Sequence, residues 1–297
     1  MMQQSATIPL SDLGLQIGAA AEPPSLRVGN ATTAGVPVAL WQSIRLRLLP
    51  RLLVWPFPLF LLLLWYLAAR YEWVAPQVLP SPQTVAVTFT DLLRSGELFD
   101  NLKISLLRVL AGFGLGLFGG LTLGVAMGLS PTFKDYVYPL FKAFSQVPVL
   151  GWLPLLMLLV GIDEALKIML ISHAALVPIT LKTYTGIQNV PSRYVEVART
   201  FTFTRWQLLS RVILPAALPP IWNGIRYGFT HAWLALVVVE LLASSEGLGY
   251  MIVFGRQLFQ LDVVMASVVV VGIVGFTLDK LLALIEVGLL SWRRVGF

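Results

Sequence analysis

Six long apolar runs dominate this sequence, and they constrain its fold more than any other feature. A helix that crosses the hydrocarbon core of a bilayer needs about 20 mostly apolar residues. Only 12% of the 297 residues are charged, against about 25% in a typical soluble domain. The sequence therefore predicts an all-α, polytopic membrane protein with about six transmembrane helices. The expected spans are residues 52–69, 104–129, 137–161, 165–187, 213–243 and 263–289.

The distribution of lysine and arginine predicts how these spans are oriented, because basic residues gather in the cytoplasmic loops of membrane proteins. One set of loops is strongly basic, whereas the opposite set holds Asp163, Glu164, Glu246 and Asp262. An even number of spans places both termini on one side, so we expect both termini in the cytoplasm. The net charge of +6 then reflects these loops, and no nucleic-acid partner is expected. The basic loop residues are Arg45, Arg47, Arg51, Lys134, Arg193, Arg199, Arg205, Arg211, Arg293 and Arg294.

The first 51 residues differ from the rest of the chain. Residues 1–40 are rich in small and polar residues and lack periodicity, which is typical of a disordered tail. Residues 41–51 carry three arginines among apolar residues. That pattern predicts a basic helix in the headgroup region, although a plain charged flank would show it as well. The transmembrane domain is expected to cover residues 52–297.

Glycines recur every four residues in the second span, which places them along one side of a helix. A glycine has no side chain, so another helix can come close, and such close contact stabilises helix pairs in lipid. We interpret the stripe as a packing surface, whose partner helix belongs either to the same chain or to a second copy. The stripe consists of Gly112, Gly116, Gly120, Gly124 and Gly128.

The stretch SQVPVLGWLP, residues 145–154, interrupts the third span. Its prolines and glycine predict a break near the middle of the membrane, where irregular backbone is tolerated only beside protein or a cavity. Ser145 and Gln146 are therefore candidates for lining a pathway through the membrane. The alternative is a simple proline kink with both side chains hydrogen-bonded to neighbouring helices.

Charged residues inside spans need an explanation, since an unpaired charge there costs several kcal/mol. Arg226 is a candidate either for an anion path or for a structural ion pair. Glu240 is expected to pair with a nearby cation, and Arg108 to lie at the outer interface. His173 and His231 fall in apolar spans, where we expect hydrogen-bonded helix contacts more often than functional groups.

The segment 191–211 is too polar to cross a membrane. Its stretch TFTFT is β-branched and aromatic, which predicts the end of a helix. Ser192 is expected to cap a short first helix, and Thr204 with Gln207 predicts a capping box for a second, which continues past Pro215. Trp206 is expected to anchor the loop. A short helix held outside the membrane is shaped to fit a groove in another protein, although an ordinary loop is the alternative.

This segment resembles the EAA loop of permease subunits of ABC importers, which reads Glu-Ala-Ala, three residues, Gly, nine residues, Ile-x-Leu-Pro. Thr202 replaces the glycine, which would adopt a positive φ at little cost, so the geometry of the turn is in question. Four positions match the motif: Glu196, Ala198, Leu214 and Pro215. Three positions depart from it: Val197, Thr202 and Val212.

The resemblance extends over residues 79–294, with blocks such as LPSPQTV and VPVLGWLPLLMLLVGIDEALKI, and is to the sulfonate, taurine and nitrate branch of these permeases. It implies a type I ABC importer permease fold and a homodimer in the lipid bilayer. It also implies two cytoplasmic ATPase subunits, which carry ATP and Mg, and a periplasmic solute-binding protein. The implied solute is a small anion: an aliphatic sulfonate first, then taurine, then nitrate.

The resemblance further implies that the short helix is a coupling helix, docked on the ATPase and moving with it. The chain itself is expected to have no catalytic residue, cofactor or metal. It lacks a Gly-x-x-x-x-Gly-Lys-[Ser/Thr] phosphate loop, and it has no cysteine and only two histidines. The implied coupling residues are Glu196, Val197, Ala198, Arg199, Thr200, Thr202, Arg205, Leu214 and Pro215.

Two other functions fit parts of the pattern. A secondary transporter or channel that works without ATP also contains broken helices and polar residues at mid-depth, but the six spans show no evident inverted repeat. A membrane scaffold that transports nothing would also present residues 191–211 to a cytoplasmic partner.

Overall fold

The computed structural model describes residues 56–291 of this chain. The expected tail at 1–40, the expected basic helix at 41–51, the start of the first span and Arg293 and Arg294 lie outside these residues. The chain divides into two compact units, 1–59 and 60–297, and only residues 56–59 of the first are described. All regular elements of the described region are helical, which confirms the all-α fold.

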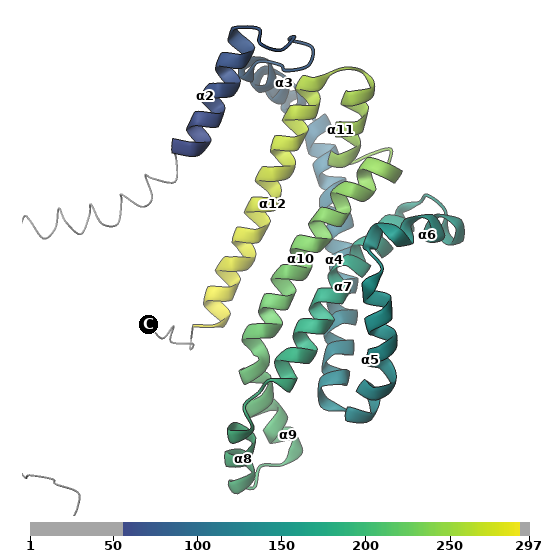
Figure 1. Cartoon of the computed structure of the whole chain (residues 1–297), viewed down its shortest axis with the longest axis vertical. Helices are drawn as coiled ribbons and strands as arrows, with labels where there is room; N and C mark the ends of the chain where they lie inside the picture. The colour runs from purple at the N-terminus through teal and green to yellow at the C-terminus, as the bar shows by residue number, and fades with distance from the viewer. Residues whose placement is uncertain (1–55, 292–297) are drawn as a thin grey trace, which may run out of the picture. The chain divides into compact units, whose positions relative to one another are not determined.

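Helices follow one another along the whole described chain (Figure 1). In order they are α2 (Pro56–Arg70), α3 (Pro82–Ser95), α4 (Glu97–Leu129), α5 (Pro131–Gln146), the short 3-10 helix η2 (Val149–Trp152), α6 (Leu153–Val160), α7 (Glu164–Gln188), α8 (Ser192–Thr200), α9 (Arg205–Leu208), the π-helical turn η3 (Leu209–Ile213), α10 (Leu214–Ala243), α11 (Leu248–Gln257) and α12 (Leu261–Leu289).

Each of the six expected spans has a helical counterpart. By length and apolar composition, α4, α7, α12 and the run Arg205–Gln257, which contains α10, are each able to cross a membrane. The third span is a pair of segments, Pro131–Gln146 and Val149–Val160, that meet at 91°, so the predicted break is confirmed. The first span is represented by the 15 residues of α2.

The glycine stripe of α4 packs against α7 of the same chain, which answers the question that the sequence left open. A Cβ added at Gly116 would lie 2.5 Å from the backbone oxygen of Ser172, and one added at Gly120 would lie 2.9 Å from the Cβ of Ile179. No side chain fits in such a space, so the two backbones approach closely and gain dispersion contacts along their length.

An adjoining side of α7 packs against α10 in the same manner. A Cβ added at Gly228 would lie 2.6 Å from Cγ1 of Ile179, and one added at Gly224 would lie 2.5 Å from the Cβ of Lys182. Helix α7 is therefore enclosed between α4 and α10 (Figure 1). We refer to these three helices as the central bundle.

Polar residues at helix starts set the connections around this bundle. Ser130 ends α4 and caps α5, because its hydroxyl accepts a hydrogen bond from the Phe133 amide at 3.2 Å. Pro131 follows at the first helical position, where its missing N–H costs nothing. The chain therefore turns sharply from α4 into α5, which brings the break at 147–149 back toward the middle of α7.

Candidate functional site

Helix α8 is the short helix predicted in the segment 191–211. It begins at Ser192, and Pro191 occupies the N-cap position with φ −55° and ψ 129°. The prediction that Ser192 caps this helix is therefore wrong. Its hydroxyl sits on the first helical residue and is not placed to accept from the amides of the first turn, and no side-chain cap is present.

Helix α8 ends in a Schellman motif, in which two backbone amides close back onto the last turn. The amide of Thr202 donates to the oxygen of Arg199 at 2.9 Å, and that of Phe203 donates to the oxygen of Ala198 at 3.1 Å. The motif requires a left-handed residue, and Thr202 supplies it with φ +55°. The turn therefore keeps the geometry of the family glycine, at a strain of about 1–3 kcal/mol for a residue of this kind.

The predicted capping box opens the next helix. The side chain of Thr204 accepts from the Gln207 amide at 3.3 Å, and the Thr204 amide donates to the Gln207 side chain at 2.9 Å. The π-helical turn η3 follows, with the Leu214 amide donating to Leu209. Pro215 has no N–H to donate to the backbone oxygen of Arg211. A widened turn therefore loses fewer backbone hydrogen bonds here than elsewhere in a helix. The segment thus runs without a break into α10, as predicted.

Helix α8 has one buried side and one exposed side. Ala198 is 3% exposed, whereas Glu196, Arg199 and Thr200 are exposed. Large apolar side chains nevertheless lie at the surface, and a shallow groove beside them is lined by residues of α8, η3 and α10. The exposed apolar residues are Tyr194, Val197, Phe201 and Trp206. The groove is lined by Tyr194, Val197, Ala198, Phe201, Phe203, Arg211, Val212, Pro215 and Ala216.

The predicted coupling residues are thus partly brought together. Val197, Ala198 and Pro215 share the groove, while Arg205 is exposed at the start of α9 and Leu214 is half-buried at the start of α10. Trp206 does not anchor the loop as expected, because its side chain is 71% exposed. It lies in the first turn of a four-residue helix that covers little of the segment.

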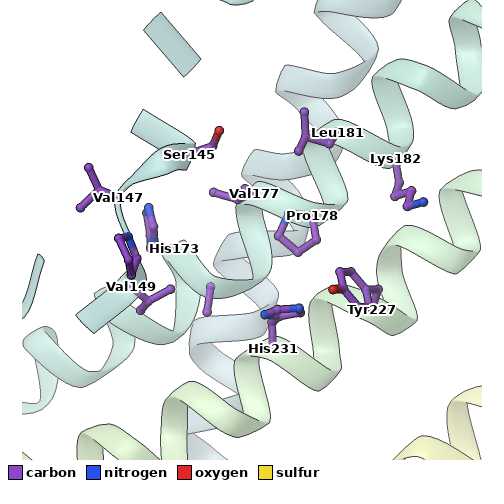
Figure 2. Close-up of a pocket in the computed structure, with 12 residues that line it drawn as sticks. Ser145, Val147, Val149, His173, Val177, Pro178, Leu181, Lys182, Tyr227 and His231 are labelled. Atoms are coloured by element: carbon purple, nitrogen blue, oxygen red, sulfur yellow. The ribbon is translucent and has the colours of Figure 1, made fainter. Parts of the chain in front are cut away.

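A cavity of about 370 Å³ lies beside the break in the third span. Figure 2 shows side chains from the break, α7 and α10 around it. Ser145 lines this cavity, whereas Gln146 is exposed outside it and Arg226 does not reach it; a role of these residues in a pathway stays a prediction. The lining residues are Ser145, Val147, Pro148, Val149, His173, Ala174, Val177, Pro178, Leu181, Lys182, Tyr227 and His231.

Sequence reasoning did not assign His173, His231 or Lys182 to this lining. His173 and His231 were expected to be hydrogen-bonded helix contacts, yet neither ring nitrogen of His173 has a partner in the described chain. Two histidines at similar depths in separate apolar spans were the available signal. Their convergence depends on how α7 and α10 pack, which the spacing within one helix does not reveal.

Arg226 joins α10 to α12. Its guanidinium donates to Asp279 at 2.9 Å and to Glu286 at 2.7 Å. Of the two interpretations of this residue, the ion pairs favour the structural one, since both carboxylates already satisfy the charge.

A second ionic cluster is buried in the central bundle. Arg108 donates to Glu240 at 2.9 Å, to both oxygens of Glu164 at 2.6 and 2.7 Å, and to the backbone oxygen of Glu246 at 2.7 Å. Glu240 also accepts from Ser105 and from the amide of Gly249. The pairing of Glu240 with a cation is thus confirmed. Arg108 itself is 3% exposed, whereas the side chain of Glu164 is 55% exposed; the position of Arg108 at the outer interface stays a prediction.

No group of three or more His, Cys, Asp or Glu side chains in the described residues is placed to hold a metal ion. The site is therefore described by packing, hydrogen bonds and charge alone.

Comparison with known proteins places these features in one family. The family described as binding-protein-dependent transport system inner membrane component matches residues 116–289. The permease protein SsuC of Bacillus subtilis (strain 168), named for aliphatic sulfonates transport, is 42% identical over 80% of this chain and 86% of its own length. The taurine transport system permease protein TauC of Escherichia coli (strain K12) is 33% identical over 78% and 86%.

The nitrate import permease protein NrtB of Synechocystis sp. is 32% identical over 70% of this chain and 79% of its own length. These matches span both the broken third span and the segment 191–211. The chain therefore belongs to the family of binding-protein-dependent transport system inner membrane components, as its motifs predicted.

Proposed function

We propose that this chain is the permease subunit of an ATP-driven importer for a small organic anion, with an aliphatic sulfonate as the first candidate and taurine and nitrate as the next. Two copies would form the pathway in the bacterial inner membrane, between a periplasmic solute-binding protein and two cytoplasmic ATPase subunits that bind ATP and Mg. The similarity to relatives named for sulfonates, taurine and nitrate supports the solute class.

The exposed apolar side chains of α8 carry the proposal of a coupling role. Val197 on α8 is 56% exposed, and Phe201, which directly follows the helix, is 70% exposed. The helix also presents Glu196 and Arg199 to solvent. Such a helix is too polar to lie in lipid, and exposed apolar patches rimmed by charge are typical of protein interfaces. A groove on a cytoplasmic ATPase subunit is the partner that we propose.

The connection from α8 into α10 supports the transmission of force. The capping box at Thr204 and the turn η3 join α8 to α10, and α10 lines the cavity through Tyr227 and His231. ATP binding would draw the two ATPases together and move the docked helices with them. The permease halves would then rotate as rigid bodies and expose the cavity to the outer side.

Pathway residues remain part of this proposal. Ser145 lines the cavity, and Gln146 lies next to the break with its side chain exposed. The ion pairs of Arg226 assign it a supporting role between α10 and α12. Both termini and the segment 191–211 would lie in the cytoplasm.

Two substitutions in α8 test the coupling role in the importer assembled with its partners in proteoliposomes. Glu196→Lys and Phe201→Ala should each lower solute uptake about tenfold, the effect of losing about 1.4 kcal/mol of docking free energy, while ATP hydrolysis continues. Phe99→Ala is the matched control, because Phe99 is 65% exposed in the first turn of α4 and lies far from α8 in the sequence.

Uptake at the wild-type rate in both α8 variants would contradict the coupling role. Uptake by the purified chain alone, without ATP or an ATPase, would instead favour a secondary transporter or channel. Absence of any effect on uptake when the chain is deleted from cells would favour a scaffold.

A further inference from the structure

We propose that the cavity beside the broken third span is a binding site for the solute in transit, and that it recognises the oxyanion group of a short alkanesulfonate. This inference rests on the proposed function. The site would consist of His173, His231, Lys182 and Ser145, with apolar walls from the break and α7 (Figure 2).

The first support is the position of the two histidines along their helices. His173 lies about 14 Å along α7 from Glu164, and His231 lies about 18 Å along α10 from Ala243, at 1.5 Å per residue. Both are thus well inside helices long enough to cross a membrane. They are the only two histidines of the chain, and they line one cavity although 58 positions separate their numbers.

The second support is that the imidazole of His173 has no hydrogen-bond partner. Its two nitrogens are buried and contact no donor or acceptor in the described residues. The ring is held instead by aromatic neighbours, with Phe144 edge-on at 4.6 Å and Trp152 at 6.0 Å between ring centroids. A buried polar group left without a partner costs about 1–3 kcal/mol, so an anion that accepted a hydrogen bond from this ring would recover that cost.

The third support is the sign of the charge around the cavity. Lys182 is among the lining residues and no acidic residue is, and Lys182 forms no ion pair with any described residue. The only acidic residues of α7 and α10 are Glu164 and Glu240, and both are paired with Arg108. Fixed positive charge without a nearby free carboxylate attracts an anion and repels a cation.

The apolar walls specify the rest of the ligand. Val147, Val177, Pro178 and Leu181 face the same cavity, and its volume of about 370 Å³ lies in the range of about 300–1,000 Å³ typical of small-molecule sites. An anion with a short alkyl chain would place its charged group at the histidines, lysine and serine and its chain against these residues. An alkanesulfonate therefore fits the cavity better than an inorganic oxyanion of the same charge.

The two histidines make the site directly observable. The full-length chain, purified with a tag that contains no histidine and placed in lipid nanodiscs, is labelled with ¹⁵N in histidine only. Titration with ethanesulfonate should then shift the imidazole signals of both residues in a saturable manner. The ethyltrimethylammonium cation, which has a similar alkyl chain and opposite charge, should shift neither.

Two variants locate the bound anion. Lys182→Gln should weaken the ethanesulfonate titration about tenfold, because it removes the positive charge from the lining. Ser145→Ala should weaken it less, because the Ser145 hydroxyl donates to the backbone oxygen of Lys142 at 2.8 Å and would have to exchange that bond for one to the anion. Lys134→Gln, near the start of α5 and outside the cavity, is the matched control and should leave the titration unchanged.

Histidine signals that do not move, that move equally with the cation, or that move unchanged in Lys182→Gln would overturn this inference. Uptake by the assembled importer separates the two proposals. If the importer carries ethanesulfonate while the signals stay fixed, the site is wrong and the function stands. If it carries no anion, the proposed function itself fails.

Discussion

The central bundle and helix α8 differ in how far their apolar side chains are buried. In the bundle, glycines of α4 and α10 enclose α7, and residues such as Ile171 and Ile179 are fully buried. In α8, only Ala198 is buried, whereas Val197 and Phe201 lie at the surface. The close contacts between α4, α7 and α10 form within one chain, whereas most of the surface of α8 is left uncovered by the described residues.

The two regions also lie at different places in the molecule. In Figure 1, α8 and α9 lie beyond the end of α7 and α10 that is opposite to α11. The buried cluster around Glu240 lies near the α11 end of α10. The cluster and α8 therefore lie at opposite ends of α10, and each part can be weakened separately.

Breaking the buried cluster should give the largest effect. Glu240→Ala removes the acceptor for Arg108, Ser105 and the Gly249 amide. Truncating one partner of a buried ion pair costs about 3–5 kcal/mol, because the other charge stays buried with less compensation. Denaturant or thermal unfolding of the purified chain in detergent measures this loss.

The matched control uses a carboxylate that pairs with the other arginine of the spans. Glu286 accepts from Arg226 at 2.7 Å, and its side chain is 30% exposed. Glu286→Ala should therefore cost only about 0–1 kcal/mol. Equal losses from the two substitutions would show that burial does not distinguish the two clusters, and the cluster at Glu240 would not be a special support of the bundle.

Crowding the contact between α4 and α7 should give the next largest effect. A methyl group at Gly116 would meet the backbone oxygen of Ser172 at 2.5 Å and the Cβ of Ala175 at 2.7 Å. Since backbone must move to admit it, Gly116→Ala should lower the free energy of unfolding by about 1–3 kcal/mol, measured by the same unfolding experiment.

Gly114 provides the control for helix propensity. It lies on the same helix, and a Cβ added there would have no neighbour within 4 Å. Gly114→Ala should leave stability unchanged or raise it by up to about 1 kcal/mol. If both alanines behave alike, close approach of α4 to α7 is not what stabilises the bundle.

Features that depend on neighbours in the sequence were predictable. The glycine spacing in α4, the break at residues 147–149 and the capping box at Thr204 each arise within a few helical turns, so the residues carry the whole signal. Six apolar runs likewise led to helical counterparts, although α4 begins seven residues and α5 six residues before the expected spans. The role of the coupling residues stays a prediction, because it concerns a partner chain.

Features that depend on which helices meet were not predictable. Arg108 lies 132 positions from Glu240, and nothing in either helix alone indicates that they touch. The cavity could not be predicted for the same reason, because His173 and His231 belong to separate spans. The cap of α8 was missed by one residue. Pro191 occupies the N-cap position and α8 begins at Ser192, so the Ser192 hydroxyl is not in the capping position.

The smallest predicted effect concerns the left-handed residue that ends α8. Thr202 adopts φ +55°, at a strain of about 1–3 kcal/mol. Glycine would remove this strain, but its greater conformational freedom in the unfolded chain would lower stability by about 0.5–1 kcal/mol. The strain is the larger of the two, so Thr202→Gly should stabilise the end of α8 by about 1 kcal/mol. Hydrogen exchange of the Thr202 and Phe203 amides, which close the Schellman motif, should slow about fivefold, the factor that corresponds to about 1 kcal/mol.

Thr202→Gly is expected to act on α8 alone. The exchange rates of amides in the central bundle should stay the same, since α8 opens locally without unfolding α7 or α10. Thr200→Gly is the matched control: Thr200 is the last residue of α8, where glycine has only its entropic cost, so exchange should become faster. If Thr202→Gly also sped exchange, the positive φ would carry no strain. If it slowed exchange in α4 and α7 as well, α8 and the bundle would unfold as one unit, and the separation between them would not hold.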